Sequence, residues 1–295
     1  MPLLIFVTLL WAFSFSLIGV FLAGQVDSYF SVLTRILLAG LVFLPFFRWR
    51  GCDHRAALAL AAIGAVQLGL MYLFYYQSFL LLSVPEVLLF TIFTPVYIAI
   101  FYDLLQRQFS PWNLVVAALA VAGAAVIRWD QPGDSFWKGF LVVQGANLCF
   151  AAGQVAYKQF MQRRPGLQAH SAFAWFYLGA GLVATVAWLL LGEPVYPSSA
   201  TQWLVLLWLG LVASGAGYYL WNQGATKVSA GTLAAMNNAL IPAGLLVNLL
   251  IWNRDADLAR LGIGGAIIVS AVLVSEWRLR RGAARTNSSA GSRHG

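Results

Sequence analysis

The chain has 295 residues, of which 61% are hydrophobic and 9% are charged, and its formal net charge is +8. A soluble domain has about a quarter of its residues charged and must expose much of its surface to water, so this composition excludes a soluble protein and predicts one embedded in lipid. The basic residues lie mostly in short gaps between apolar stretches instead of forming one patch, which argues against a nucleic-acid partner.

Ten apolar stretches are long enough to cross a bilayer as helices, because a span needs about 20 mostly apolar residues. The gaps between them are short and rich in Gly, Pro, Asp and Ser, so consecutive helices are expected to be antiparallel. A membrane β-barrel is excluded, because its strands of about 10 residues would alternate in polarity. The predicted fold is therefore all-α, with ten transmembrane helices. In chain order the predicted spans are 2–24, 29–47, 56–80, 85–104, 112–128, 138–158, 172–192, 202–224, 231–252 and 260–277.

The placement of Lys and Arg predicts the orientation of these spans. With the N-terminus in the cytoplasm, most basic residues fall in the inside gaps and in the C-terminal tail, and most acids fall outside. An odd number of spans would destroy this bias. Both termini are therefore expected to be cytoplasmic, in a bacterial inner membrane, and the basic tail 278–295 is expected to be disordered.

The two halves of the chain resemble each other. The stretch Gln77–Val84 aligns with Gln223–Ala230, and a proline follows in each next span, Pro95 and Pro242. We therefore predict two five-helix repeats, 1–128 and 138–277. Because five is odd, the second copy enters the membrane from the opposite side, and such inverted repeats are typical of secondary transporters.

Several short motifs resemble the EamA-type family of the drug/metabolite transporter superfamily. They are Leu10–Phe15 (LWAFSF), Leu33–Arg35 (LTR), Ser83–Glu86 (SVPE), Asn237–Pro242 (NNALIP) and the closing stretch Gly262–Val274. The resemblance covers essentially the whole chain. It implies ten helices in two inverted halves around a central cavity lined by the first, third, fourth, sixth, eighth and ninth helices.

The chain departs from this family at one feature. Members often carry Gly-Glu-Arg after the fourth and ninth helices, where this sequence reads Leu105-Gln106-Arg107 and Trp252-Asn253-Arg254. Any role of that acid does not carry over. Members of this family export amino acids, amines, carboxylates or drugs. The resemblance therefore implies transport but does not identify the substrate.

Polar side chains within the spans are concentrated in these same helices, which the residue pattern shows without reference to any family. Because polar groups are costly in lipid, they are expected to face a cavity or to join neighbouring helices, and both interpretations stay open for each residue. Tyr75 and Tyr219 are expected to be packing residues. The candidate substrate-binding residues are Trp11, Ser14, Tyr72, Tyr76, Tyr97, Asn147, Gln154, Tyr218, Asn222 and Asn238.

Four further residues are candidates for special roles. Arg35, which lies inside the second span, is expected to anchor neighbouring groups instead of contacting substrate. Glu86 is either a coupling group or a charge at a helix N-terminus, and the second interpretation is favoured because the helix dipole stabilises acids there. Pro95 and Pro242 interrupt their helices and are candidate gating kinks.

The sequence therefore predicts a secondary transporter that exports a small metabolite, such as an amino acid or amine, by alternating access. A cavity of aromatic and amide groups with almost no fixed charge suits such a substrate. The alternatives are a channel or facilitator for a small neutral solute and a membrane-embedded enzyme. No catalytic motif occurs, and Cys52 and Cys149 are too few for a metal site, so no cofactor is expected.

Overall fold

The computed structural model describes residues 2–47, 53–105, 134–228 and 230–252, and the helical positions 259, 262, 263, 266 and 270. Every regular element in this part of the chain is helical. Seven of these helices are long and apolar enough to cross a membrane, and α12 adds a shorter apolar run, 239–252. The protein is thus an integral membrane protein with several apolar helices. Predicted span 112–128, most of span 260–277 and the tail lie outside the described residues.

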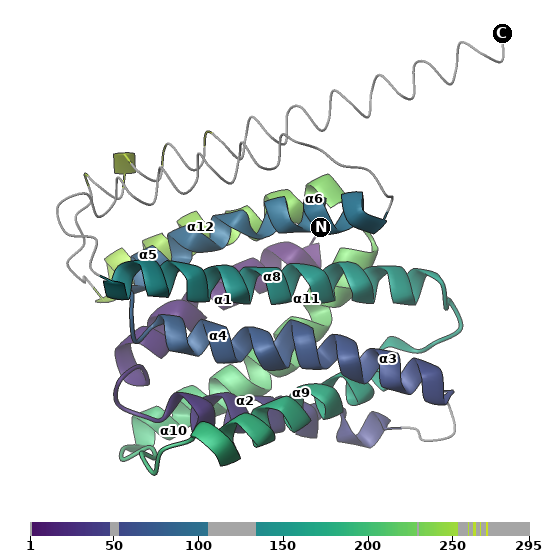
Figure 1. Ribbon diagram of the computed structural model, residues 1–295, viewed down its shortest axis with the longest axis horizontal. Coiled ribbons are helices and arrows are strands. Elements are labelled where there is room, and N and C mark those ends of the chain that lie inside the picture. Colours follow the sequence, from purple (N-terminus) through teal and green to yellow (C-terminus); the bar gives the residue numbers. More distant parts are fainter. Residues whose placement is uncertain are drawn as a thin grey trace, which may run out of the picture.

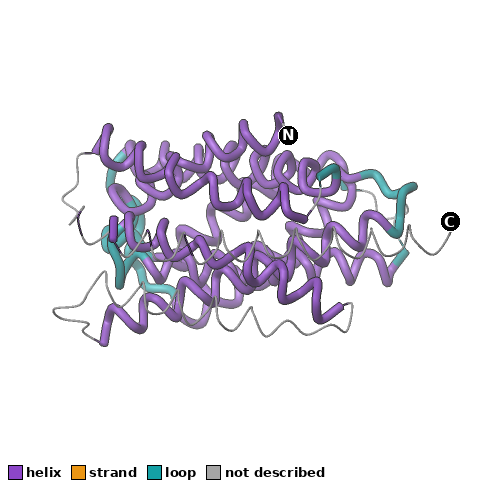
Figure 2. Tube along the Cα trace, turned by 90° about the horizontal axis from the view of Figure 1, so that it is seen from above, coloured by secondary structure: helices purple, strands orange, loops and turns teal. Residues whose placement is uncertain are grey.

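The helices run along a common axis, and the loops gather at the two ends of the bundle (Figures 1 and 2). Short η elements continue or interrupt the α-helices within one span. The elements are α1 (Pro2–Phe21), α2 (Ser28–Phe43), η1 (Leu44–Phe46), α3 (His54–Gly64), η3 (Ala65–Leu70), α4 (Met71–Ser78), α5 (Val84–Phe90), η4 (Thr91–Phe93), α6 (Thr94–Leu105), α8 (Asp134–Gln162), α9 (Ala169–Leu191), α10 (Ala200–Leu207), η5 (Trp208–Ala216), α11 (Gly217–Thr226) and α12 (Ala230–Trp252).

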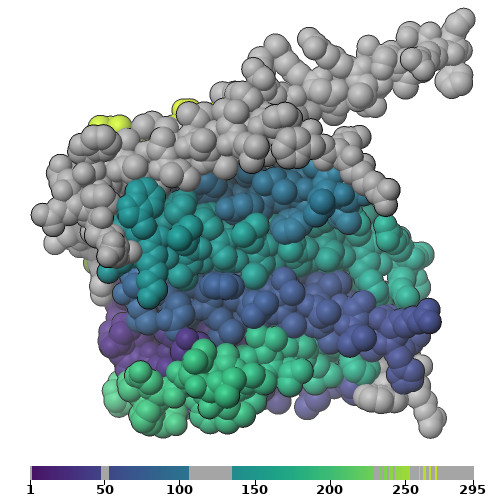
Figure 3. Space-filling view, viewed as in Figure 1, coloured from purple at the N-terminus to yellow at the C-terminus, as the bar shows by residue number. Residues whose placement is uncertain are grey.

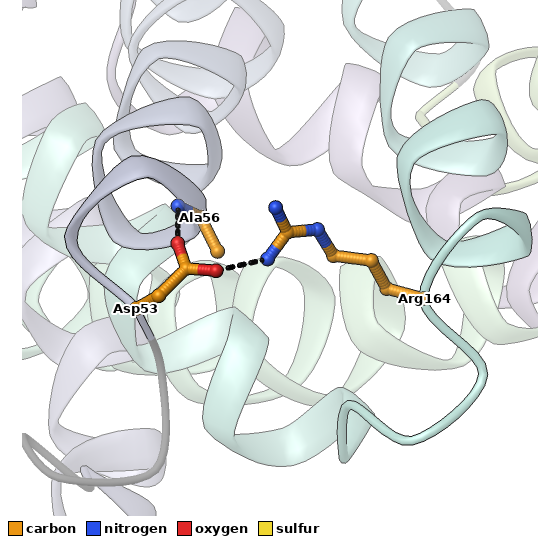
Figure 4. A network of polar contacts seen from close by, with 3 residues as sticks. All are labelled: Asp53, Ala56 and Arg164. Atoms are coloured by element: carbon orange, nitrogen blue, oxygen red, sulfur yellow. Dashed lines mark hydrogen bonds and ion pairs between the residues drawn. The ribbon is translucent and has the colours of Figure 1, made fainter.

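Side-chain caps fix where several helices begin. The carboxylate of Asp27 accepts a hydrogen bond from the amide of Phe30 at the start of α2, at 2.7 Å. Asp53 caps α3 through the amide of Ala56 at 2.6 Å, and its other oxygen lies 2.7 Å from Nη1 of Arg164 (Figure 4). Such caps satisfy amides that have no partner within the helix. They explain why these helices begin within a few residues of the predicted spans.

Two spans contain a π-helical segment. The π-helical segment η3 separates α3 from α4, and the longer π-helical segment η5 separates α10 from α11. The alignment of Gln77 with Gln223 makes these two spans counterparts, so both predicted repeats carry a π segment in the same span. A π turn displaces carbonyl groups from their usual partners, and such turns are frequent at functional sites.

The helices pack in three groups. The middle of the bundle holds α1, α4, α8 and α11, with α2, α9 and α10 on one side and α5, α6 and α12 on the other (Figure 1). The surfaces of α8 and of α3 and α4 lie side by side on the face shown in Figure 3. One apolar core runs through all of these groups. Large apolar side chains also cover the outside, among them Leu182, Leu190 and Leu250, as expected where lipid replaces water.

Helices α3 and α9 approach so closely that their backbones touch. A Cβ atom added to Gly64 would lie 1.9 Å from the carbonyl oxygen of Phe176, and one added to Gly179 would lie 1.8 Å from that of Ala61. Small residues at such crossings let membrane helices gain close contact.

Candidate functional site

A cavity lies within the bundle, between the middle helices and both flanking groups. About 90 Å³ of it can be reached by the centre of a water molecule. Its lining residues are Trp11, Ser14, Phe15, Arg35, Met71, Tyr72, Tyr75, Thr91, Thr94, Ala146, Asn147, Phe150, Tyr218, Trp221, Asn237 and Leu240.

Arg35 on α2 is the charged residue of this wall. Its side chain is only 2% exposed. Nε donates a hydrogen bond to Oγ of Ser214, and Nη1 donates to the hydroxyl of Tyr76 at 3.4 Å. The guanidinium carbon lies 4.2 Å from the ring centroid of Tyr72, in the range of a cation–π contact. No carboxylate in the described part of the chain forms an ion pair with Arg35.

The π segment η5 provides the partners that hold this wall together. The hydroxyls of Tyr72 and Ser214 are 2.9 Å apart. The carbonyl of Ser214 accepts a hydrogen bond from the hydroxyl of Tyr177 at 2.6 Å, and the carbonyl of Ala213 accepts one from Nε1 of Trp11 at 2.9 Å. The carbonyls of Ala213 and Ser214 thus bind side chains of α1 and α9, and the hydroxyl of Ser214 binds side chains of α2 and α4.

A second polar group lies where α8 meets α5 and α6. Nδ2 of Asn147 donates to the carbonyl of Phe90 at 2.8 Å and to Oε1 of Gln144 at 3.1 Å, and Oδ1 accepts from the hydroxyl of Thr94 at 3.3 Å. The hydroxyl of Ser14, also on the cavity wall, has no hydrogen-bond partner among the described residues. Ser14 thus offers a free hydroxyl to a ligand, whereas both N–H donors of Asn147 are already used within the protein.

Aromatic rings form much of the remaining wall. The ring of Trp11 lies 5.0 Å from those of Tyr218 and Trp221 and 6.3 Å from that of Phe150, measured between centroids. This arrangement presents flat apolar faces beside a few polar groups. It suits a small ligand that is largely apolar and carries one negative charge, since Arg35 is the one charged residue among the described residues of the wall.

The structure divides the predicted substrate-binding residues into two groups. Trp11, Ser14, Tyr72, Asn147 and Tyr218 line the cavity together.

The remaining predicted residues lie behind the wall or in contacts between helices. Tyr76 supports Arg35, and the hydroxyl of Tyr97 donates to Gln144 at 3.1 Å. Gln154 accepts from Nε1 of Trp221 at 2.9 Å and Asn222 accepts from Nε2 of Gln67 at 3.2 Å, so these two amides join helices, which is the second interpretation that the sequence left open. The side chains of Asn238 and Pro242 lie outside the described residues.

Sequence reasoning missed part of the wall. Arg35 was expected to be an anchor and Tyr75 a packing residue, yet both line the cavity. Tyr219, in contrast, packs against Phe43 and Phe173 as expected. A signal for Arg35 existed, because an ionisable residue within a span is by default a candidate for function. The other wall residues that were not selected are Phe15, Met71, Thr91, Thr94, Ala146, Phe150, Trp221, Asn237 and Leu240.

Glu86 and Pro95 lie in the same span but do different things. Oε2 of Glu86 accepts hydrogen bonds from the amide and the hydroxyl of Ser83, both at 2.8 Å, in a capping box at the start of α5. This geometry fits the interpretation as a helix N-terminal charge. Pro95 follows the 3₁₀ turn Thr91–Phe93, as expected where a residue without an amide hydrogen interrupts the hydrogen-bond ladder.

Comparisons with known proteins identify the family of the chain. The model of the EamA-like transporter family matches the chain twice, over residues 1–129 and 137–276. A protein of Pseudomonas aeruginosa named "Probable biotin transporter" is 56% identical over 92% of this chain and 96% of its own. Proteins named "Biotin transporter" from Salmonella typhimurium and Escherichia coli K12 are 52% and 51% identical, each over 93% of this chain and 92% of its own.

A likeness also exists among solved structures. One crystal structure superposes with a TM-score of 0.67 at 20% identity, covering 95% of this chain and 98% of the other. At this identity the likeness shows a shared fold alone.

Proposed function

The chain belongs to the EamA-like transporter family, and we propose that the substrate it carries across the bacterial inner membrane is biotin. The observation that carries this proposal is the set of relatives named for biotin transport, which share more than half of their aligned residues with this chain over nearly its whole length. The family assignment makes the protein a transporter and not an enzyme.

The chemistry of biotin supports the proposal. Biotin has an apolar side chain that ends in a carboxylate and a fused ring that carries a urea group, so at neutral pH it is an anion with one charge. The cavity offers one cation, aromatic faces and several amides and hydroxyls. An amine would meet the positive charge of Arg35 without a carboxylate to neutralise it, which is unfavourable. Because the relatives are named for biotin transport, biotin replaces the amino acid or amine that the sequence alone suggested.

We propose that transport occurs by alternating access between two inverted five-helix halves. The two separate matches to the family model and the paired π segments support this mechanism. Both termini then lie in the cytoplasm. Reporter fusions at the two ends test this orientation, and ends found on opposite faces of the membrane would contradict it.

Uptake by cells tests the substrate. The protein is produced in a bacterial strain that cannot make biotin and lacks its own biotin transporter, and uptake of labelled biotin is measured against an empty vector. The proposal predicts saturable uptake and growth on low biotin. Labelled phenylalanine is the control for the amino acid alternative. Equal biotin uptake with and without the protein would overturn the proposal, as would phenylalanine uptake in place of biotin uptake.

A further inference from the structure

We propose that Arg35 binds the carboxylate of the substrate, and that Tyr72 and Ser214 hold its guanidinium group in place for this purpose. The inference rests on the proposed function, because it assigns one residue to one group of biotin. It changes the role of Arg35 from the structural anchor suggested by its position in the sequence to a ligand-binding residue that is itself anchored.

The first observation that supports this role is the charge balance of the wall. Arg35 is buried, and no carboxylate in the described part of the chain neutralises it. A buried charge without a counter-ion is costly, and a cation–π contact offsets only part of that cost. The ring of Tyr72 at 4.2 Å therefore leaves the site short of one negative charge. An anionic ligand in the cavity supplies that charge.

The second observation is the set of hydrogen bonds that the guanidinium group makes. An arginine has five N–H donors. Nε is directed at Ser214 and one Nη1 donor at Tyr76, and Tyr72 covers a face of the group. Three donors remain, one on Nη1 and two on Nη2, and one from each nitrogen can form a fork on the edge between Nη1 and Nη2 that matches the two oxygens of a carboxylate. A ligand carboxylate is thus expected to approach along that edge.

The third observation is the close backbone packing of α2 against η5. A Cβ atom added to Gly210 would lie 2.6 Å from Cβ of Leu38 and 3.2 Å from the carbonyl oxygen of Arg35, so the two helices are in close contact. This contact and the bonds to Ser214 fix the guanidinium group before a ligand arrives. Preorganisation of this kind raises affinity, because less freedom is lost on binding.

A comparison of two ligands tests the role. Purified protein is incubated with labelled biotin. Unlabelled biotin and biotin amide, in which an uncharged amide replaces the carboxylate, are then added separately as competitors, and the affinity of each is measured. The wild-type protein is expected to prefer biotin. In Arg35→Gln, the affinity for biotin is expected to fall roughly 10- to 100-fold while the affinity for the amide changes by less than about 2-fold. Arg35→Lys keeps the charge without the fork, so its affinity for biotin is expected to lie between those of the wild type and Arg35→Gln.

Arg164→Gln is the matched control, because it removes the same charge at the exposed ion pair with Asp53. It is expected to behave like the wild type. The inference is overturned if Arg35→Gln keeps the wild-type preference, or if it loses both ligands equally, as a purely structural role requires. Wild-type protein that binds no biotin would overturn the proposed function and the inference with it. Wild-type binding with unchanged selectivity in Arg35→Gln would overturn the inference alone.

Discussion

The indole nitrogen of Trp11 is a polar group in a mostly apolar wall, and the π turn of η5 supplies its partner. Its bond to the carbonyl of Ala213 joins α1 to the span that also holds Ser214. The same residue therefore contributes a ring to the cavity and a link between helices. This double use explains why the wall can be apolar and still have a defined shape.

The Trp11 bond can be tested by removing the donor. Trp11→Phe keeps an aromatic ring but leaves the carbonyl of Ala213 without its partner, so the free energy of unfolding is expected to fall by about 1–2 kcal/mol. Thermal unfolding in detergent measures this. Trp203→Phe is the control, because Trp203 on α10 is 43% exposed and lies outside the cavity. Equal effects of the two changes would contradict the assignment.

Asp53 predicts a dependence of stability on pH. The amide of Ala56 and then the guanidinium of Arg164 hold the pKa of the Asp53 carboxyl below its ordinary value (Figure 4). The charged cap therefore stabilises the fold above the ordinary pKa of about 3.9, and this contribution is lost as the pH falls through the lowered value.

The variant Asp53→Asn keeps a capping oxygen but not the charge. Its thermal midpoint is expected to lie below that of the wild type at neutral pH, and the two midpoints are expected to converge in acid. Midpoints measured in detergent from neutral pH to pH values below about 3.9 check this. A difference that stays constant over this range would show that the charge of Asp53 does not contribute.

At the residue scale, the sequence identified part of the site and could not complete it. Polar residues stand out within an apolar span, which is why Asn147 and Gln154 were both selected on α8. The structure places the first on the cavity wall and the second against Trp221. A span that is apolar on all sides gives no hydrophobic pattern from which to predict its rotation. The choice between cavity and helix contact therefore required the packed structure.

At the scale of the elements, the helix positions followed from composition while the irregular turns did not. Long apolar stretches bounded by caps such as Asp27 and Asp53 gave the spans to within a few residues. The π segments 65–70 and 208–216 were not predicted, because an added residue in a helical turn leaves no mark on hydropathy. The 3₁₀ turn before Pro95 was signalled by the proline, but its role as a gating kink stays a prediction.

The crossing of α3 and α9 makes a sharp prediction about glycine. Gly179→Ala places a methyl group 1.8 Å from the carbonyl oxygen of Ala61, so the helices must separate and the protein is expected to lose several kcal/mol of stability or to fail to fold. Gly181→Ala, on the same helix, meets no atom within 4 Å. It is expected to be neutral or to stabilise by up to about 1 kcal/mol through helix propensity.

Expression yield and thermal unfolding of the two variants give the comparison. Both changes are glycine to alanine in one helix, so differences in propensity cancel. Similar stabilities would contradict the close crossing.

At the scale of the whole molecule, the bundle places the buried cation of Arg35 where helices from both predicted halves meet. Arg35 and Tyr72 come from the first half, and Ser214 from the second. A substrate bound there contacts both halves, so a relative movement of the halves can expose it to either side of the membrane. The all-helical membrane class and the family followed from the sequence, whereas the proposed negative charge of the substrate rests on the wall of the cavity.

Counterflow of biotin in proteoliposomes tests the central claim most directly. Purified protein is reconstituted into liposomes loaded with unlabelled biotin, and a trace of labelled biotin is added outside. The account predicts that the label accumulates transiently above its equilibrium level, and that loading with phenylalanine instead of biotin gives no such accumulation. Simple equilibration of the label without an overshoot, or an equal overshoot with phenylalanine inside, would contradict a biotin carrier.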